Sequence, residues 1–298
     1  MLRTALTERL GLRHPIVQAP MGGVSGPELV DAVSAAGALG MLTAGPKTGA
    51  DALRADIGAA RGRVGIGTLA WRLDADPELL DVALEAQPVA IAISAGDPAP
   101  HAPRVLAAGV PLLVQVSSAE AARAAVAAGA SFVVAQGTDA GGHTGSVGTL
   151  PLLEAVLAAV EDVPVLAAGG IASGRGLAGV LAMGAAGAWI GTRFYATREA
   201  LGGDEKKQRI VAARETDTVH TRVFDIAQAL PWPAEFPGRA LRSDFTDRWH
   251  GHEDEVEPQP VDYVYAGEAV GAIADVPSAA ELVERMAAEA EGLLRRFV

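Results

Sequence analysis

The stretch VLAAGGIASGRGLAGVLAMGAAGAWIGTRF, residues Val165–Phe194, decides the fold. With the residue before it, this stretch opens on an apolar run, Pro164–Ala168, which ends at two glycines. A helical pattern, Gly174–Met183, follows Ser173, a residue type that often caps helices, and a second apolar run, Ala188–Phe194, completes the unit. A strand, a helix and a further strand in this order predict a βαβ unit with parallel strands.

Apolar runs of the same kind recur along the first two thirds of the chain, with helical patterns between them. The eight runs are Pro15–Ala19, Leu39–Ala44, Val64–Ala70, Val89–Ala95, Pro111–Val116, Phe132–Gln136, Pro164–Ala168 and Ala188–Phe194. Helix-start signals precede three further helical segments: Ser25 before Glu28–Ala36, Ser118 before Ala119–Ala128 and Pro151 before Leu152–Val160. Eight units favour an α/β fold of the (β/α)8 TIM-barrel type, because open doubly wound sheets usually have about five or six strands.

The chain changes in character after the eighth run. Residues 203–262 are more polar, and seven of the thirteen aromatic residues lie between Phe224 and Tyr265. The segment Leu230–Pro237, LPWPAEFP, carries three prolines and therefore cannot form a regular helix or a central strand. A small second domain beside the mouth of the barrel is the structure that this change predicts.

Three parts follow from these patterns. We expect residues 1–202 to form the barrel and residues 203–262 to form a small inserted cap or substrate domain. Residues 263–298 form the last part, in which the amphipathic helix Ala279–Leu294 packs back on the barrel through one apolar face.

Composition excludes several classes of protein. The net charge of −12 without a basic stripe argues against binding to nucleic acid. The absence of cysteine excludes disulfides, cysteine-ligated zinc and thiol nucleophiles, so any redox chemistry must come from a cofactor. His250 and His252 match no standard metal spacing and are interpreted as solvated surface, so no metal site is expected. With no secretory signal and no membrane span in the sequence, we expect a cytoplasmic protein.

The loop after the sixth run is the most informative segment. It reads QGTDAGGHTG, from Gln136 to Gly145, and contains four glycines within nine residues. Such a loop suits a backbone that passes close to a ligand and brings a base to it. The base would be His143, because an unperturbed imidazole pKa of about 6.5 suits proton transfer near neutral pH. A flexible surface loop with an incidental histidine is the alternative, and the position at a strand end favours the functional interpretation.

Glycines also follow three other strands. Met21, Gly22 and Gly23 follow the first run, where they fit either close approach to a ligand or an ordinary turn. Loops after the seventh and eighth strands of such barrels often bind phosphate through backbone N–H groups, and here these loops contain Gly169, Gly170, Gly191 and Thr192. The segment Gly65–Ala70 matches a dinucleotide-binding pattern, but it lies inside an apolar run, which disfavours a Rossmann site.

Three stretches of the chain resemble the nitronate monooxygenase family, formerly called 2-nitropropane dioxygenases, and the related FMN-dependent enoyl-ACP reductases. They are Pro15–Gly45, Ala135–Gly145 and Val165–Phe194, and the later piece Tyr265-Ala266-Gly267 is also similar. The resemblance implies an FMN-binding barrel with a smaller inserted domain. It also implies that His143 is the active-site base near the flavin.

The resemblance further implies a set of flavin-binding residues. The isoalloxazine ring would lie against Met21 and Gly22, and Gln136 and Gly141 would line the flavin side of their loop. Gly169, Gly170, Gly191 and Thr192 would hold the phosphate. Ala19, Gly67, Gly142 and Ala168 complete the expected set. The chain departs from the family at Gly67, where the family often has Asn, and at Asp139, where it usually has Glu.

The implied activity is the oxidation of nitronates or nitroalkanes to carbonyl compounds with release of nitrite, using dioxygen. The expected partners are therefore a small-molecule substrate and dioxygen. An alternative is an NAD(P)H-dependent reductase of an enoyl thioester or a quinone, in which Arg193 either serves near the mouth or is an ordinary surface residue. A non-catalytic flavin protein and a flavin-free barrel that binds a sugar phosphate are further alternatives.

Overall fold

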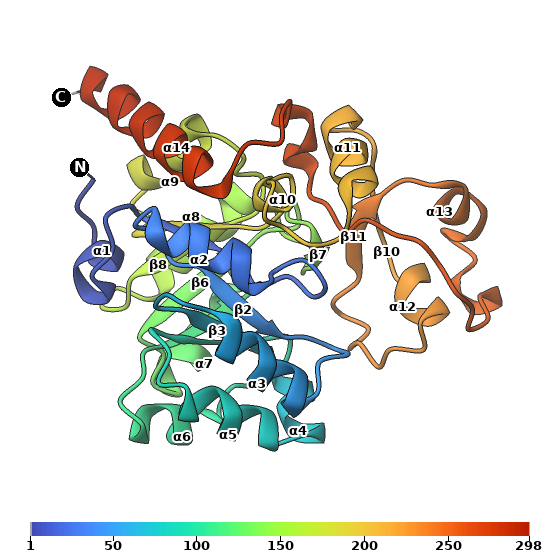
Figure 1. Ribbon diagram of the computed structural model, residues 1–298, viewed down its shortest axis with the longest axis horizontal. Coiled ribbons are helices and arrows are strands. Elements are labelled where there is room, and N and C mark those ends of the chain that lie inside the picture. The colour runs from blue at the N-terminus through green and yellow to red at the C-terminus, as the bar shows by residue number, and fades with distance from the viewer. Residues whose placement is uncertain (1, 298) are drawn as a thin grey trace.

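Eight parallel strands form one sheet in the computed structural model, which describes residues 2–297 (Figure 1). The strands are β1 (Ile16–Gln18), β2 (Met41–Ala44), β3 (Gly65–Leu69), β4 (Ile91–Ser94), β5 (Leu112–Val116), β6 (Phe132–Gln136), β8 (Val165–Ala168) and β9 (Gly187–Ile190). Their order in the sheet is β1-β9-β8-β6-β5-β4-β3-β2. The eight parallel strands and the barrel predicted from the sequence are confirmed.

The barrel closes between its first two strands through a side chain as well as through backbone. Val17 and Leu39 form a parallel bridge, and the backbone N–H of Gln18 donates to the carbonyl of Leu39 at 2.8 Å. The fully buried side chain of Gln18 accepts a hydrogen bond from the N–H of Met41 at 3.0 Å and so extends the seam. Gln18 thus pairs buried N–H and C=O groups of the first two strands that would otherwise lack hydrogen bonds.

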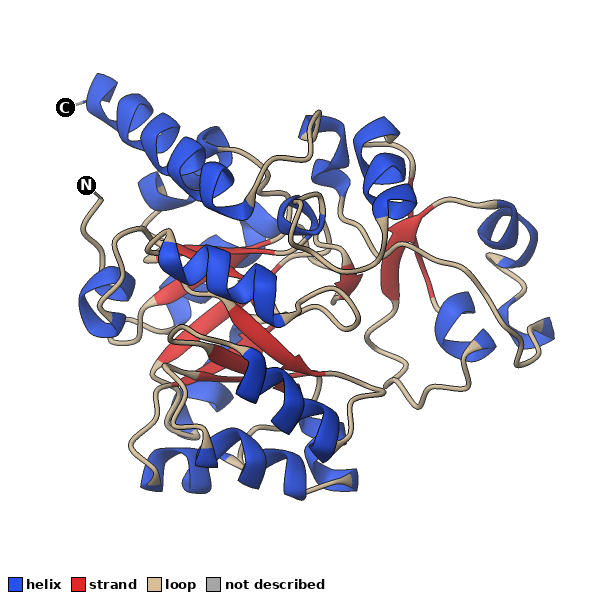
Figure 2. Cartoon of the chain, in the orientation of Figure 1, coloured by secondary structure: helices blue, strands red, loops and turns tan. Residues whose placement is uncertain are grey.

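Helices surround the sheet on its outer side (Figure 2). The helix α1 (Ala5–Leu10) is different, because its Leu6 and Leu10 pack with residues such as Val17 and Phe132 in the cluster inside the barrel. The surrounding helices are α2 (Pro27–Ala35), α3 (Ala50–Ala59), α4 (Ala70–Ala75), α5 (Glu78–Glu85), α6 (Ala102–Ala107), α7 (Ala119–Ala127), α8 (Thr149–Ala159), α9 (Gly174–Ala182), α10 (Thr192–Tyr195) and α14 (Ala279–Leu294). The last of these packs against α9 and α2, with the bounds expected from the sequence (Figure 1). No helix within residues 2–297 has both the length and the apolar content that crossing a membrane requires.

Two local expectations are wrong. Ser25 does not cap α2, because Gly26 is the N-cap and the Ser25 hydroxyl instead accepts hydrogen bonds from Gln18 Nε2 and Met21 N at 2.8 and 2.9 Å. The eighth strand does not continue to Phe194, because the chain turns at Gly191 and enters α10. Ser118 and Ser173 do cap their helices, through hydrogen bonds from the N–H groups of Ala121 and Gly176.

A second, antiparallel sheet stands beside the open end of the barrel (Figure 1). Its strands are β10 (Thr218–Thr221), β11 (Gly238–Leu241) and β7 (Gly142–His143), in the order β10-β11-β7. The segment between and around them contains α11 (Asp204–Ala212), α12 (Val223–Ala227), α13 (Asp244–Trp249) and the 3₁₀ helices η1 (Glu253–Glu255) and η2 (Glu268–Ala272), and a third 3₁₀ helix, η3 (Arg295–Phe297), follows α14. We call these three strands the small sheet.

The small sheet has its own apolar cluster and joins the two parts of the chain. Val223, Phe224, Ala227, Ala240 and Val256 form the buried centre of this cluster, with aromatic side chains around it. The strand β7 belongs to the loop after β6, so one strand of the small sheet comes from the barrel. The proline-rich segment Leu230–Pro237 forms neither helix nor strand, as the sequence predicts. The domain boundaries at residues 202 and 262 stay predictions.

Candidate active site

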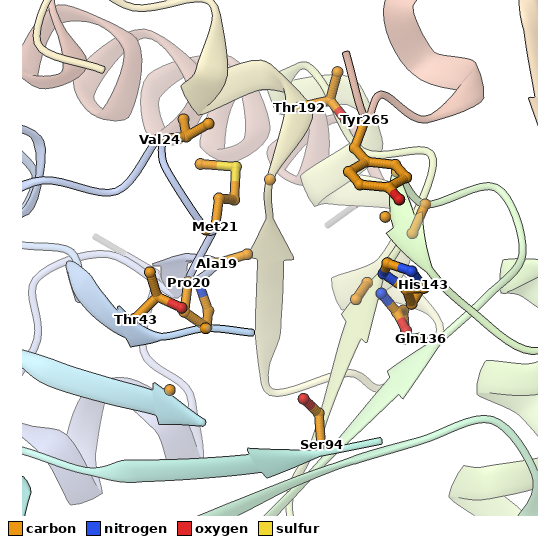
Figure 3. A pocket seen from close by; sticks show the side chains of 18 of the residues that line it. Ala19, Pro20, Met21, Val24, Thr43, Ser94, Gln136, His143, Thr192 and Tyr265 are labelled. Carbon is orange, nitrogen blue, oxygen red and sulfur yellow. The ribbon is translucent and has the colours of Figure 1, made fainter. Parts of the chain in front are cut away.

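A cavity of about 510 Å³ lies at the carboxyl ends of the barrel strands, which is the usual place of active sites in this fold (Figure 3). Its size is within the range of small-molecule sites, about 300–1,000 Å³. All thirteen residues expected from the sequence line it: Ala19, Met21, Gly22, Gly67, Gln136, Gly141, Gly142, His143, Ala168, Gly169, Gly170, Gly191 and Thr192. The fold thus brings them together, while their roles toward a ligand stay predictions.

His143 is held by three neighbours. Its Nε2 lies 2.9 Å from Oδ1 of Asp225 on α12, and these side chains are only 9% and 2% exposed. The hydroxyl of Tyr265 donates to the same carboxylate oxygen, also at 2.9 Å. The ring of Trp232 stacks on the imidazole with centroids 3.4 Å apart and planes 6° from parallel. His143 is therefore a fixed group at the cavity wall.

The small sheet sets the position of this histidine. His143 pairs with Gly238 of β11, and Tyr265 bridges to Ala240 of the same strand. Gly238 has to be glycine, because a Cβ there would lie 2.5 Å from Cε1 of Tyr265 and 3.4 Å from Nε2 of His143. Burial, followed by the nearby Asp225 carboxylate, raises the pKa of Tyr265 well above its ordinary value of 10, so its hydroxyl stays protonated.

Three of the four glycines of the His143 loop are required by packing within the protein, whether or not the loop also approaches a ligand. A Cβ at Gly137 would clash with the backbone of Thr149. At Gly141 it would lie 2.7 Å from the backbone of Ala266, and at Gly145 it would lie 2.6 Å from Ser117. Gly142 differs: its φ is +75° and no atom lies within 4 Å of an added Cβ. Of the four glycines, only Gly142 is required by its backbone conformation and not by contacts with neighbouring atoms.

The neighbouring ends of β1, β9 and β8 carry groups that fit a flavin and its phosphate. Cβ atoms added at Gly22, Gly170 and Gly191 would come no closer to other atoms than 3.5 Å, so no atom of the protein would clash with them, although the φ of +70° at Gly170 favours glycine there in any case. The backbone N–H groups of Gly170 and Ile171 have no acceptor among residues 2–297, and α9 begins just beyond them. Free N–H groups beside a helix N-terminus suit a phosphate. Met21 lies across the cavity from His143 and Gln136 (Figure 3).

Sterics explain the glycine at position 67, which is one of the two departures from the family pattern. A Cβ there would overlap the ring of Pro20, which follows β1 and also lines the cavity. A larger residue at Gly67 would therefore require Pro20 to move. The wall at the end of β3 consequently has no polar side chain at this position.

Arg193 is neither at the cavity mouth nor on the surface, so both expectations for it are wrong. Its side chain is 2% exposed and Nη2 donates to Oδ1 of Asp275 at 3.0 Å. The cations that line the cavity are instead Lys47 and Lys206. Lys206 pairs with Asp262 at 2.8 Å, whereas Nζ of Lys47 donates to the uncharged amide of Gln228 at 2.9 Å. Lys47 is the cation available to an anionic group of a substrate.

The residues that hold His143, which are Asp225, Trp232 and Tyr265, were not predicted as site residues from the sequence, and neither were the cavity lysines Lys47 and Lys206. The concentration of aromatic residues between 224 and 265 was a usable signal for Trp232 and Tyr265. Asp225 had a weaker signal, a single acid within the apolar segment VFDIA. His250 and His252 lie outside the cavity, each beside a glutamate of η1, and the part of the chain described holds no group of three potential metal ligands.

Comparison with known proteins places this geometry in a family. The family model described as nitronate monooxygenase matches residues 3–65 and 71–290. The chain is 38% identical over 251 residues to the (3aS,4S,5R,7aS)-5-hydroxy-7a-methyl-1-oxo-octahydro-1H-indene-4-carboxyl-CoA dehydrogenase of Rhodococcus jostii, covering 83% of this chain and 67% of the relative. It is 35% identical over 266 residues to a nitronate monooxygenase of Pseudomonas aeruginosa, covering 72% and 75%.

A solved structure is also similar over the whole chain. FabK from Thermotoga maritima, an enoyl-ACP reductase, superposes with a TM-score of 0.87 at 28% identity and covers 100% of this chain and 99% of FabK. The two resemblances read from the sequence are thereby confirmed. The chain belongs to the nitronate monooxygenase family of oxidoreductases, whose members typically bind flavin.

Proposed function

We propose that the protein is an FMN-dependent enzyme that oxidises nitroalkanes and nitronates to carbonyl compounds with release of nitrite, using dioxygen. The observation that carries this proposal is the position of His143, a base fixed 2.9 Å from a buried carboxylate in the same cavity that Gly22, Gly170 and Gly191 line. A nitroalkane is a carbon acid, so its oxidation requires a base beside the site of electron transfer.

The flavin would lie against the neighbouring ends of β1, β9 and β8. Met21 and Gly22 would lie against its ring, and Gly169, Gly170, Gly191 and Thr192 would surround its phosphate. When bound, FMN would supply the redox chemistry by accepting electrons from the substrate and passing them to dioxygen.

The chain's own residues would supply orientation and proton transfer. His143 would take the proton from the carbon that bears the nitro group, and Asp225 would balance the charge of the imidazolium that forms. The ring of Trp232 would keep water from one face of His143, because it stacks on that face at 3.4 Å. A substrate that arrives as the nitronate anion would need orientation by His143 but no deprotonation.

A second candidate is the dehydrogenation of a coenzyme A thioester. It is favoured by the 38% identity to the coenzyme A ester dehydrogenase over 83% of the chain. The carbon next to a thioester carbonyl is also a carbon acid, so His143 would have the same task. Lys47, which has an uncharged partner at the cavity mouth, would be available to a phosphate of coenzyme A.

Substrate turnover distinguishes these candidates. The FMN-loaded protein would be given nitroethane or ethyl nitronate in air, and nitrite release and dioxygen uptake would be followed together. We expect nitrite with both compounds. Turnover of acyl-CoA with an artificial electron acceptor, without any nitrite from the nitro compounds, would replace the first candidate by the second. Flavin reduction by NAD(P)H alone would favour a reductase, and loss of all flavin reactivity would contradict both candidates.

A further inference from the structure

We infer that Asp225, held by Tyr265, is a positioning residue that fixes His143 in the tautomer able to take a proton from the substrate; this inference rests on the proposed function. Neither residue was identified by the sequence reasoning. Both come from the part of the chain that follows the barrel, whereas the histidine belongs to the loop after β6.

The hydrogen bonds determine which imidazole nitrogen carries the proton. The Tyr265 hydroxyl donates to Oδ1 of Asp225, so the carboxylate acts as an acceptor. Nε2 of His143 lies 2.9 Å from the same oxygen and must therefore donate as well. In the other neutral tautomer, a lone pair of Nε2 would face a carboxylate oxygen at this distance. The carboxylate thus selects the Nε2–H tautomer and leaves the Nδ1 lone pair free.

Nδ1 is the atom that would react. It makes no hydrogen bond with any residue described between positions 2 and 297, and His143 lines the cavity. In the proposed step the C–H bond of the nitroalkane breaks and an N–H bond forms at Nδ1. The electron pair of the broken bond stays on the substrate, which becomes the nitronate.

Asp225 is suited to the charge that this step creates. Its Oδ2 is buried and has no hydrogen-bond partner among the described residues, so the carboxylate is incompletely compensated while His143 is neutral. Protonation of His143 would place a positive charge beside it. Tyr263, Tyr265 and His220 interact with this pair, and burial, followed by the charge of Arg239, lowers the pKa of His220, which favours its uncharged form at neutral pH.

The test compares two substrates that differ by one proton. Asp225→Asn keeps the shape of the side chain, but its amide can donate to Nε2 and so allows the wrong tautomer. We expect kcat/KM for nitroethane to fall by a factor on the order of 10²–10⁴, while the value for ethyl nitronate, which is already deprotonated, changes little. A Tyr265→Phe variant should lose about tenfold on nitroethane alone, the effect of one hydrogen bond to a charged group. Equal losses on both substrates would overturn the positioning role.

The chain provides a matched control. His101 and Asp74 form another histidine–aspartate pair, at 3.0 Å, and neither residue lines the cavity. Asp74→Asn should leave both substrates unaffected. A loss of nitroethane turnover in Asp74→Asn equal to that in Asp225→Asn would contradict a specific role for Asp225.

A second readout does not depend on turnover. The ¹⁵N shifts of the imidazole nitrogens, assigned with a His143→Gln variant, report the tautomer in the purified protein. We expect neutral His143 to be protonated on Nε2 in the wild type and to lose this preference in Asp225→Asn. An Nδ1-protonated wild-type histidine, or an unchanged tautomer in the variant, would overturn the inference. If the wild type oxidises neither nitro compound, the proposed function fails, and the tautomer still decides whether Asp225 positions His143.

Discussion

The barrel and the small sheet contribute different chemistry to the same cavity. The barrel provides backbone and small residues that line the cavity, such as Gly22, Gly170 and Gly191. The small sheet and its neighbouring segments provide His143, Asp225 and their aromatic neighbours, fixed by hydrogen bonds and stacking. The proposed flavin site and the proposed base are thus carried by different parts of the chain, so a substitution should be able to disable either one alone.

The largest effect is expected from His143→Gln. The variant lacks a base, so kcat/KM for nitroethane should fall by a factor on the order of 10²–10⁴. FMN affinity should stay close to that of the wild type, because the barrel half of the cavity is unchanged. Steady-state nitrite release and a fluorescence titration with FMN measure the two quantities. Loss of FMN affinity together with activity would contradict the separation of the two halves.

Gly191→Val tests the other half. The added side chain would contact Met21 and Ala19 and project from the part of the cavity wall where the flavin is proposed to bind. We expect FMN affinity to fall roughly a hundredfold, the equivalent of about 3 kcal/mol of steric conflict. Gly179→Ala, on an exposed and open face of α9, is the control and should bind FMN normally. Unchanged FMN binding by Gly191→Val would remove Gly191 from the site.

Gly238→Ala should disturb the contacts that position His143 without changing the barrel. The new Cβ would lie 2.5 Å from the ring of Tyr265, which would have to move away from Asp225. We expect the free energy of unfolding to fall by about 1–3 kcal/mol because of overpacking. Relative to the wild type, turnover of nitroethane should fall more than turnover of ethyl nitronate. Urea denaturation and the two assays measure these changes. Full activity on nitroethane would show that the spacing of Gly238 and Tyr265 does not matter.

The smallest effect concerns alkaline pH. Burial, with a contribution from Asp262, raises the pKa of Tyr195 to about 12, whereas in the unfolded chain it is about 10. Between these values the unfolded chain releases the proton and the folded chain retains it, so stability falls as the pH rises through this window. Between pH 8 and 11, the free energy of unfolding of Tyr195→Phe should therefore fall by on the order of 1 kcal/mol less than that of the wild type. An identical pH dependence in the variant would contradict this shift.

The sequence predicted the barrel half of the molecule well and the small sheet poorly, for physical reasons. Buried parallel strands are continuous apolar runs, and Val165–Ala168 or Phe132–Gln136 are recognisable from composition alone. The two-residue strand β7 has no such pattern, because Gly142 and His143 become a strand only by pairing with residues about a hundred positions later. The contact between His143 and Asp225, 82 residues apart, is likewise a product of tertiary structure.

The glycines show a second limit. Their density around His143 correctly drew attention to the loop, although Gly137, Gly141 and Gly145 make room for Thr149, Ala266 and Ser117. Sequence alone cannot distinguish a glycine that admits a ligand from one that admits another part of the chain. Gly191 and Gly137 look alike in the sequence and differ only in what surrounds them.

Titration of the flavin-free protein with FMN, followed by anaerobic addition of ethyl nitronate, tests the central proposal most directly. We expect one FMN to bind per chain and its absorbance to change when the nitronate is added, in the wild type and in His143→Gln alike. A protein that takes up no FMN would contradict the assignment of Gly22, Gly170 and Gly191 to a flavin site. A bound flavin that nitronate leaves unchanged would contradict the proposed substrate.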